Sequence, residues 1–240
     1  PLFRATLKDC LVLASHREVL VTMGIRPRNP NTGFGYIEYG DPCESFGETE
    51  IFAVKRFIEK PDIVRAAQFV AAGNYGWNSG MFAWSVYTLK KALKKHRPAL
   101  HDMSRRLLPV VGTKGFSKTL LREYKALERI SIDYAIMEKA SNVVVAKGQF
   151  PWSDVGTWAA VEEHLANDAM QNVLVGDCQV LESVGNVVYS SERLTALIGV
   201  KDLVVVQSKY ATLVCAKERA QDVKKMVELL EKAGEYGYLL

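Results

Sequence analysis

A change in residue pattern near position 170 limits what this chain of 240 residues can fold into. Before it, short apolar runs alternate with segments whose apolar residues recur at helical spacing, which is typical of an α/β layered domain with a mostly parallel or mixed sheet. From residue 172 to residue 215, short β-type runs follow one another with polar breaks, which indicates a small β-solenoid or β-meander. We therefore predict a partial α/β domain over residues 1–168 and a β-rich subdomain over residues 169–240.

Local signals place the individual helices and strands. Pro61 and Asp62 are expected to begin a helix that Gly73 ends, and Ser85 is expected to cap another that runs to Pro98. The first of these two should bury Ile63, Ala66, Ala67, Val70 and Ala71. Strands are expected over residues 19–25, 34–39, 51–59, 81–84 and 142–150, and further helices over residues 2–16, 99–108, 117–128, 131–140, 157–165 and 217–233.

The last predicted helix is amphipathic. Ala220, Val223, Val227 and Leu230 fall on one stripe of it. We expect this stripe to pack on a neighbouring surface of the same chain, in preference to a partner helix or subunit.

Composition and charge exclude several classes of function. The formal net charge is only +4, and the Lys and Arg residues are scattered along the sequence, so no nucleic-acid partner is expected. No apolar run approaches the roughly 20 residues that cross a bilayer, so no membrane partner is expected either. The cysteines form no C-x-x-C pair, which favours free thiols in a reducing, cytoplasmic compartment. They are Cys10, Cys43, Cys178 and Cys215.

The run F-P-W-S-D-V-G-T-W, residues 150–158, places a carboxylate directly after an apolar strand. Asp154 would lie on a short turn between two tryptophans, where a rigid carboxylate is well placed to bind a divalent metal that bridges phosphates. The alternative is that Asp154 caps the following helix, a task for which Thr157 competes.

Two further motifs place polar or flexible residues near strand ends. In N-T-G-F-G-Y, residues 31–36, Gly35 offers backbone that a polar ligand can approach closely, or it serves a turn into a strand. In F-I-E-K-P-D, residues 57–62, Glu59 can accept sugar hydroxyl hydrogen bonds and Lys60 can neutralise a phosphate. The alternative for this second motif is a solvated ion pair before a helix cap.

Two more motifs carry polar side chains of less certain role. In W-N-S-G-M-F, Asn78 and Ser79 suit hydroxyl recognition or a turn into a strand. In S-I-D-Y-A-I-M-E-K, Ser131 is expected to cap a helix whose dipole stabilises Asp133 in the first turn, so a substrate role for Asp133 is the lesser interpretation. The four histidines show neither metal-ligand spacing nor a partnered nucleophile.

Taken together and in order, these motifs resemble the mannose-1-phosphate guanylyltransferase family of sugar nucleotidyltransferases. The resemblance rests on V-T-M-G-I-R-P-R-N-P-N-T-G-F-G-Y-I-E, F-I-E-K-P-D, W-N-S-G-M-F-A-W, S-I-D-Y-A-I-M-E-K and F-P-W-S-D-V-G-T-W, and it covers the chain from about residue 19 to the last helix. It implies a Rossmann-like α/β nucleotidyltransferase domain, followed by a short left-handed β-helix and a C-terminal helix. It also implies that GTP and mannose 1-phosphate give GDP-mannose and pyrophosphate with Mg²⁺.

The resemblance also implies roles for particular residues. Asp154 resembles the second metal-binding aspartate, Glu59 the acceptor of sugar hydroxyls and Lys60 the cation for the sugar phosphate. Gly35 would offer its backbone to the sugar, while Asn78 and Ser79 would line the same pocket. Asp133 matches its motif without an assigned role.

The sequence departs from the family at its beginning. It lacks the G-x-G-x-R loop with its downstream lysine, and it lacks the P-A-D-H-type turn with the first metal aspartate. We therefore expect the nucleotide half of the site to be missing and the chain alone to be inactive. The alternatives are a non-catalytic sugar-phosphate-binding or assembly module, or a nucleotidyltransferase for another hexose 1-phosphate. An isomerase domain in the parent protein and a homo-oligomer are both left open.

Overall fold

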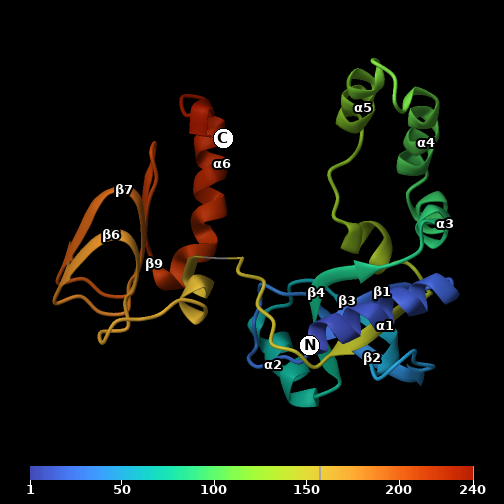
Figure 1. Cartoon of the computed structure of the whole chain (residues 1–240), viewed down its shortest axis with the longest axis horizontal. Helices are drawn as coiled ribbons and strands as arrows, with labels where there is room; N and C mark the ends of the chain where they lie inside the picture. The colour runs from blue at the N-terminus through green and yellow to red at the C-terminus, as the bar shows by residue number, and fades with distance from the viewer. Residues whose placement is uncertain (157, 240) are drawn as a thin grey trace. The chain divides into compact units, whose positions relative to one another are not determined.

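The computed structural model describes residues 1–156 and 158–239 (Figure 1). The chain divides into two compact units, Pro1–Trp152 and Ser153–Leu240. The boundary expected at residues 168 and 169 stays a prediction about domains, since compactness alone divides the chain after Trp152.

Five strands of the first unit close into a barrel in the order β1-β4-β2-β3-β5. β1 and β5 are parallel, and the other four strand pairs of the described barrel are antiparallel, so the sheet is mixed, as the sequence allowed. Every residue of β1 is buried, which explains its unbroken apolar run. The strands are β1 (Leu20–Ile25), β2 (Tyr36–Cys43), β3 (Ile51–Ile58), β4 (Tyr75–Ala83) and β5 (Val143–Gly148).

Two helices cover this barrel, α1 (Leu2–His16) and α2 (Ile63–Ala72). Both were predicted, and the signals that begin and end α2 are confirmed: Asp62 accepts a hydrogen bond from the Arg65 amide, and Gly73 has φ 73°. The predicted buried face is wrong in part, because Ile63, Ala67 and Ala71 are exposed. Ala66 is buried as predicted and Val70 is half-buried. Phe69, which was not predicted, is buried because its ring stacks on Tyr75 at a centroid distance of 4.4 Å.

The strand expected over residues 81–84 is longer than predicted and begins at Tyr75. Asn78 and Ser79 therefore lie within β4, and the interpretation of their motif as a turn is wrong. The pairing of β4 with β1 shifts register between Thr22 and Gly24, and Gly80 has φ 69°. This bulge-like irregularity redirects side chains next to Asn78.

Three helices extend from the barrel of the first unit (Figure 1). They are α3 (Val86–His96), α4 (Pro98–Leu107) and α5 (Phe116–Lys125), with a short 3₁₀ turn, η1 (Leu108–Val110), after α4. The Ser85 hydroxyl accepts a hydrogen bond from the Thr88 amide, which confirms the predicted cap. The helices expected near residues 99–108 and 117–128 are confirmed.

The helix expected over residues 131–140 is replaced by one wide π-helical turn, η2 (Asp133–Met137). Ser131 gives this turn no side-chain cap, so the predicted capping role is wrong. The Glu138 amide donates to the Asp133 carbonyl five residues earlier, and this spacing defines a π turn. Such turns occur frequently at functional sites.

The second unit is a parallel stack of strands, which confirms the solenoid and excludes the meander. β6 (Val173–Leu181), β7 (Val187–Ile198) and β8 (Leu203–Gln207) pair in parallel, and β9 (Thr212–Ala216) pairs antiparallel with β8. Val173, Val187 and Val204 stack in register inside the stack and are almost fully buried.

Two asparagines hold the turns of this stack together. Asn172 and Asn186 are fully buried. Asn172 Oδ1 accepts from the Asn186 amide and from Asn186 Nδ2, both at 2.9 Å. Asn186 Oδ1 accepts from the Leu203 amide at 3.0 Å, so the same side chain satisfies backbone in the next turn.

The remaining elements of the second unit are short. The helix expected over residues 157–165 is a 3₁₀ helix, η3 (Trp158–Glu163), and Thr157 lies outside the described residues. The helix expected over residues 217–233 is divided into η4 (Lys217–Asp222), a 3₁₀ helix, and α6 (Val223–Ala233), and η5 (Gly237–Leu239) follows.

The predicted packing of the last apolar stripe is found only in part, because Val223 and Leu230 are half-buried rather than buried. Ala220 on η4 is buried, but α6 has no buried residue, and Val227 is 37% exposed. The 3₁₀ geometry of η4 has three residues per turn rather than 3.6, which moves Ala220 out of phase with Val227 and Leu230.

Candidate functional site

Four segments of the first unit meet around the side chain of Glu59. Gly35 precedes β2, Glu59 follows β3, Asn78 lies on β4 and Asp133 begins η2. The backbone N–H of Asn78 donates to the Gly35 carbonyl at 2.7 Å, and the side-chain Nδ2 of Asn78 donates to Asp133 Oδ1 at 2.9 Å. The structure thus brings together four of the residues that the sequence singled out.

Gly35 leaves room for the Glu59 carboxylate. A Cβ at this position would overlap Glu59 Oε2 and lie 3.4 Å from the Asn78 Cβ. The carboxylate therefore lies directly against the Gly35 backbone, an approach that any larger residue would prevent.

One of the two carboxylate oxygens of Glu59 is a buried acceptor. The Oε2 atom is buried and has no hydrogen-bond partner among the described residues. Burial raises the pKa of the carboxyl group, and the negative charge of Asp133 raises it further, while Lys60 opposes the rise. A buried carboxylate oxygen without a donor costs stability, and such exceptions call for an explanation such as a ligand.

Lys60 lies next to this acceptor and holds an unusual backbone conformation. Its Nζ is 4.0 Å from Glu59 Oε1, and its side chain is 64% exposed. Its φ of 45° lies in the left-handed region, which non-glycine residues seldom adopt. Such strain occurs preferentially at functional sites.

Thr22 fixes the orientation of the Asn78 amide, and sequence reasoning missed it. Thr22 is fully buried on β1, and its hydroxyl donates to Asn78 Oδ1 at 3.2 Å. The Gly80 amide donates to the same oxygen at 3.1 Å. With Nδ2 bound to Asp133, the amide has one defined orientation and one remaining N–H. The available signal was the single hydroxyl within the apolar run V-L-V-T-M-G-I.

Ser79 uses its hydroxyl within the sheet. Its Oγ donates to the Met23 carbonyl on β1 at 2.7 Å and accepts from the Met81 amide. These bonds tie β4 to β1 where their register shifts. The hydroxyl therefore contributes directly to the fold, and its contact with a ligand stays a prediction.

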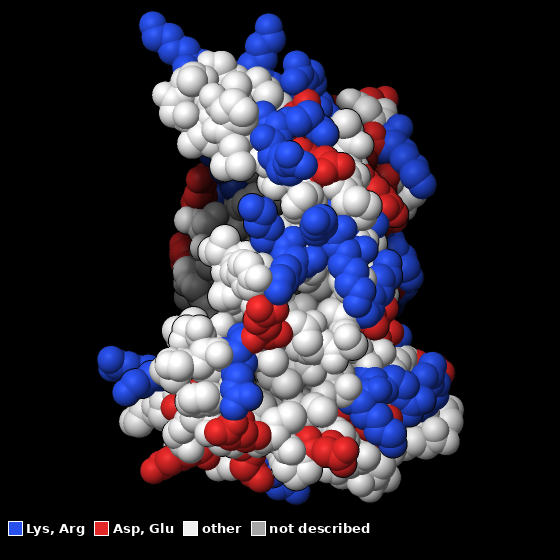
Figure 2. Space-filling view, turned by 90° about the vertical axis from the view of Figure 1, so that its right-hand side faces the viewer, with Lys and Arg blue, Asp and Glu red and all other residues white. Residues whose placement is uncertain are grey.

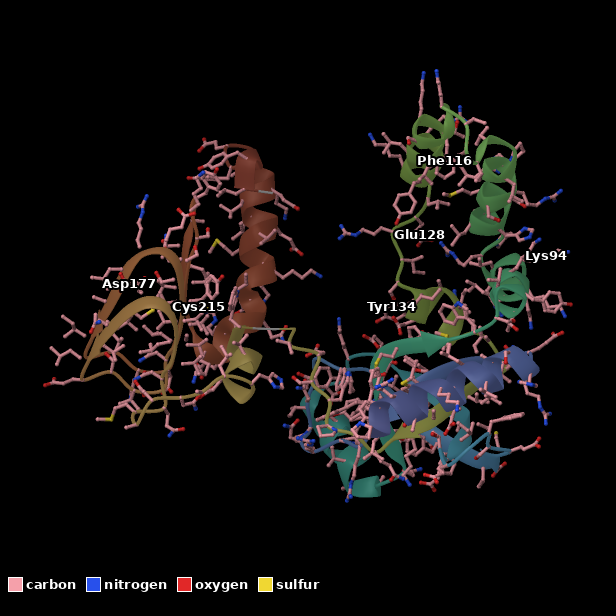
Figure 3. All side chains as sticks on the ribbon, in the orientation of Figure 1. Lys94, Phe116, Glu128, Tyr134, Asp177 and Cys215 are labelled. Atoms are coloured by element: carbon pink, nitrogen blue, oxygen red, sulfur yellow. The ribbon has the colours of Figure 1, made fainter. Side chains whose placement is uncertain are left out.

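Tyr134 and Glu138 extend the site beyond the residues that the sequence singled out. Burial raises the pKa of the Glu138 carboxyl, and nearby Asp133 raises it further. Burial and the negative charges of Glu59, Glu138 and Asp133 raise the pKa of the Tyr134 hydroxyl. Figure 3 labels Tyr134 on η2, at the base of the three extending helices. Tyr134 and Glu138 are both exposed, so they add a hydroxyl and an acidic group at the edge of this cluster.

Aromatic rings pack near this polar cluster. Phe34 contacts Trp77 and Trp152 edge-on, with centroid distances of 5.0 and 5.3 Å. Trp77 precedes Asn78, so β4 passes from this apolar packing directly to the polar site.

A cavity of about 810 Å³ lies where β1 and β5 end. Ile25 and Gly148, the last residues of these parallel strands, pair with each other, and Arg26 and Arg28 follow β1 along the cavity wall. Lys147 also lines it but is bound to Glu50 at 2.9 Å. Arg26 and Arg28 make no ion pair within the described chain, so they give the cavity its net positive charge.

Asp154 belongs to the second unit, so its relation to Glu59 stays a prediction. It is exposed, and its Oδ1 accepts from the Gly156 amide at 3.1 Å. Val155 between them has φ 46°, which is a strained conformation for a β-branched residue. The alternative role of Thr157 as a cap concerns a residue outside those described.

The donor chemistry of Asp154 fits a hard divalent cation only as one ligand among several. The described residues contain no group of three or more His, Cys, Asp or Glu that could hold a metal ion. Mg²⁺ commonly takes one or two carboxylates together with water and substrate phosphates. A single aspartate at a turn is compatible with that arrangement.

The matched family models define the class of this protein. The nucleotidyl transferase model matches residues 2–171, and the chain therefore belongs to the nucleotidyl transferase family. Enzymes of this family typically use a divalent metal. A second model, the MannoseP isomerase/GMP-like beta-helix domain, matches residues 176–230. Both parts of the fold class expected from the sequence are thus confirmed.

Individual relatives confirm the narrower resemblance. The chain is 37% identical to the mannose-1-phosphate guanylyltransferase of Escherichia coli K12 over 98% of its own length and 49% of the relative. It is 36% identical to the alginate biosynthesis protein AlgA of Pseudomonas aeruginosa over 92% of its length and 46% of that protein. The chain thus spans about half the length of these relatives.

A solved structure agrees with the family models and with the individual relatives. The crystal structure called mannose-1-phosphate geranyltransferase, from Thermus thermophilus, aligns with a TM-score of 0.78 at 36% identity, covering 95% of this chain and 65% of the other. No helix in the described part of the chain is long and apolar enough to cross a membrane.

Proposed function

We propose that this chain is the sugar-phosphate-binding part of a mannose-1-phosphate guanylyltransferase, which forms GDP-mannose and pyrophosphate from GTP and mannose 1-phosphate. The observation that carries the proposal is the buried, unpartnered Oε2 of Glu59 against the backbone of Gly35 and beside Asn78. A sugar hydroxyl is the kind of donor that this oxygen lacks. The names of the similar proteins support mannose as the sugar.

Each site residue then has a defined task. Glu59 accepts hydrogen bonds from sugar hydroxyls, and the remaining N–H of Asn78 donates to a sugar oxygen. Lys60 holds the sugar phosphate as a point charge. Asp133 and Thr22 act through Asn78, because their hydrogen bonds set the direction of its amide.

The cavity beside β1 and β5 is suited to bind a second anionic group near the sugar. Arg26 and Arg28 supply positive charge at the carboxyl ends of two parallel strands, where ligands of α/β proteins commonly bind. We assign the phosphates of the nucleotide to this cavity, so the parts of the nucleotide half that this sequence lacks are the glycine-rich loop with its lysine and the first metal aspartate.

Positioning and charge carry the chemistry in this proposal. A phosphate oxygen of the sugar attacks the α-phosphorus of GTP in line, and pyrophosphate leaves. Two anions must approach each other, so Lys60 and the arginines reduce their repulsion. Mg²⁺, for which we propose Asp154 as a protein ligand, would neutralise further charge on the phosphates.

Calorimetry with mannose 1-phosphate tests the sugar site. The wild-type chain should bind it, Glu59→Gln should weaken binding by at least about tenfold, and Glu48→Gln, an exposed matched control, should not. Equal binding by wild type and Glu59→Gln would contradict the proposal. Equal binding of glucose 1-phosphate would instead favour a nucleotidyltransferase for another hexose.

Titration with GDP-mannose in the presence and absence of Mg²⁺ tests the metal site. We expect Mg²⁺ to strengthen binding to the wild-type chain and to have no effect on Asp154→Asn. The same Mg²⁺ dependence in both proteins would remove Asp154 from the site. A cytoplasmic location and the absence of a nucleic-acid partner stay predictions.

A further inference from the structure

The three helices that extend from the barrel form the most basic part of the chain. Residues 86–129, here called the basic arm, contain twelve Lys or Arg residues and three Asp or Glu residues. The whole chain has 31 Lys or Arg residues and 27 Asp or Glu residues, so the positive charge of the arm alone exceeds the net charge of +4 of the chain. Figure 2, viewed from the side that carries α3 and α4, shows Lys and Arg side chains gathered on that face. The cations are therefore concentrated in one continuous segment, and the expectation that Lys and Arg are scattered along the sequence is wrong for residues 86–129.

Most arginines of the arm are neutralised, and most of its lysines are not. Arg97 binds Glu128 and Arg106 binds Glu123, both at 2.8 Å, and Arg122 binds Glu123 at 3.0 Å. Lys91 binds Glu18. The other cations of the arm are exposed and make no ion pair within the described chain: Lys90, Lys94, Lys95, Arg105, Lys114, Lys118, Lys125 and Arg129.

The end of the arm is apolar. Leu108 and Val111, between α4 and α5, are 66% and 60% exposed. Phe116, which begins α5, also lies at this end (Figure 3). Exposed apolar side chains beside Arg105, Lys114 and Lys118 form an apolar tip flanked by positive charge. Exposed apolar side chains bordered by charged ones are characteristic of an interaction site.

We propose that the basic arm binds the surface of an anionic lipid bilayer, with the apolar tip entering the headgroup region. Lysine is a flexible point charge that suits a diffuse anionic surface, whereas specific phosphate recognition favours the arginine fork. Leu108 and Val111 supply the apolar contact that a nucleic-acid backbone does not need, and cations beside apolar and aromatic residues are typical of interfacial helices. This contact departs from the sequence-based expectation that no membrane is involved.

Co-sedimentation with vesicles tests the proposal. The chain should bind vesicles of equimolar phosphatidylcholine and phosphatidylglycerol, and it should not bind phosphatidylcholine alone. Binding should fall steeply when salt is raised from low to physiological concentration, because the exposed charges are then screened. Absence of binding to the anionic vesicles, or binding to a single-stranded RNA in their place, would overturn the proposal.

Two double variants separate charge from apolar contact. Lys114→Glu with Lys118→Glu should reduce vesicle binding by at least about tenfold. Leu108→Ser with Val111→Ser should also reduce vesicle binding, while the salt dependence of the binding stays unchanged. The matched control, Lys201→Glu with Lys209→Glu, makes the same charge change on exposed residues of the second unit and should bind like the wild type.

Circular dichroism checks that each variant keeps its helical content. An unchanged affinity of the Leu108 and Val111 variant would overturn insertion of the tip. An equal loss in the control would overturn the arm as the binding surface. Mannose 1-phosphate binding is measured in parallel and should be unaffected, so failure of this inference is distinct from failure of the proposed function.

Discussion

Glu59 holds a negative charge that its surroundings oppose. Burial and the nearby Asp133 carboxylate both raise its pKa. A carboxyl group whose folded-state pKa exceeds its ordinary value of 4.5 lowers stability at neutral pH. That cost is relieved as the pH falls through the raised pKa, and it is absent below 4.5, where folded and unfolded chains are both protonated.

Glu59→Gln should therefore stabilise the folded chain. We expect the free energy of unfolding at pH 7 to rise by about 1 kcal/mol, because the variant removes a like-charge contact and a buried anion. The gain should vanish below pH 4.5. Urea unfolding of the variant and wild type across this pH range measures both effects, and a variant less stable than wild type at pH 7 would contradict them.

Thr22 offers a second prediction at this scale. Thr22→Val keeps the shape of the side chain but removes the donor to Asn78 Oδ1, so mannose 1-phosphate binding should weaken roughly fivefold, the equivalent of about 1 kcal/mol. Thr22→Ser keeps the hydroxyl and should bind like the wild type. Calorimetry measures the affinity of both variants for mannose 1-phosphate. Equal affinities of the Thr22→Val and Thr22→Ser variants would show that the hydrogen bond has no positioning role.

The sequence predicted the residue types of the site better than their surroundings. Glu59, Lys60 and Gly35 follow from motif chemistry, because each stands beside a strand. Asn78 follows from the donors and acceptor of its side chain, although its position within β4 was not predicted. The interactions of Asp133 could not be predicted, since a helix dipole explained its position and the contact with Asn78 spans 55 residues. Thr22 was hidden for the same reason, as its partner lies 56 residues away.

The β-helix depends on polar side chains inside a stack of apolar strands. Asn172 and Asn186 satisfy backbone groups of successive turns at positions from which water is excluded. The sequence showed only short β-type runs with polar breaks, and it gave no sign of these hydrogen bonds because the partners of each asparagine belong to other turns of the stack.

Asn186→Leu should destabilise the stack. The leucine side chain is similar in size but leaves the backbone N–H of Leu203 without its acceptor, so we expect the free energy of unfolding to fall by about 3 kcal/mol. Asn167→Ala, a change at an exposed asparagine of the same unit, should cost less than about 0.5 kcal/mol. Denaturant unfolding followed by circular dichroism measures both, and similar costs for the two variants would argue against the ladder.

Each unit of the molecule has its own buried core. One set of clusters is built on the barrel around Tyr36 and Ile136, and another on the stack around Val173 and Val188. The loss of helical spacing near residue 170 predicted a division there, whereas compactness divides the chain after Trp152. Closure of the strands into a barrel depends on pairings that local patterns do not encode.

Separate cores predict separate unfolding. Differential scanning calorimetry should resolve two transitions, and Asn186→Leu should lower only one of them while Glu59→Gln raises the other at pH 7. A single transition that both variants shift would show that the chain unfolds as one cooperative unit.

The π turn of η2 sets how tolerant this region is to changes in length. One extra residue in the turn rotates everything before it by about 100° relative to an ordinary α-helix. Loss of any single residue between Asp133 and Met137 would restore the narrower turn and swing the Asp133 carboxylate away from Asn78. The conformation of this segment is thus encoded in its residue count, so that deletions would harm ligand recognition more than most substitutions.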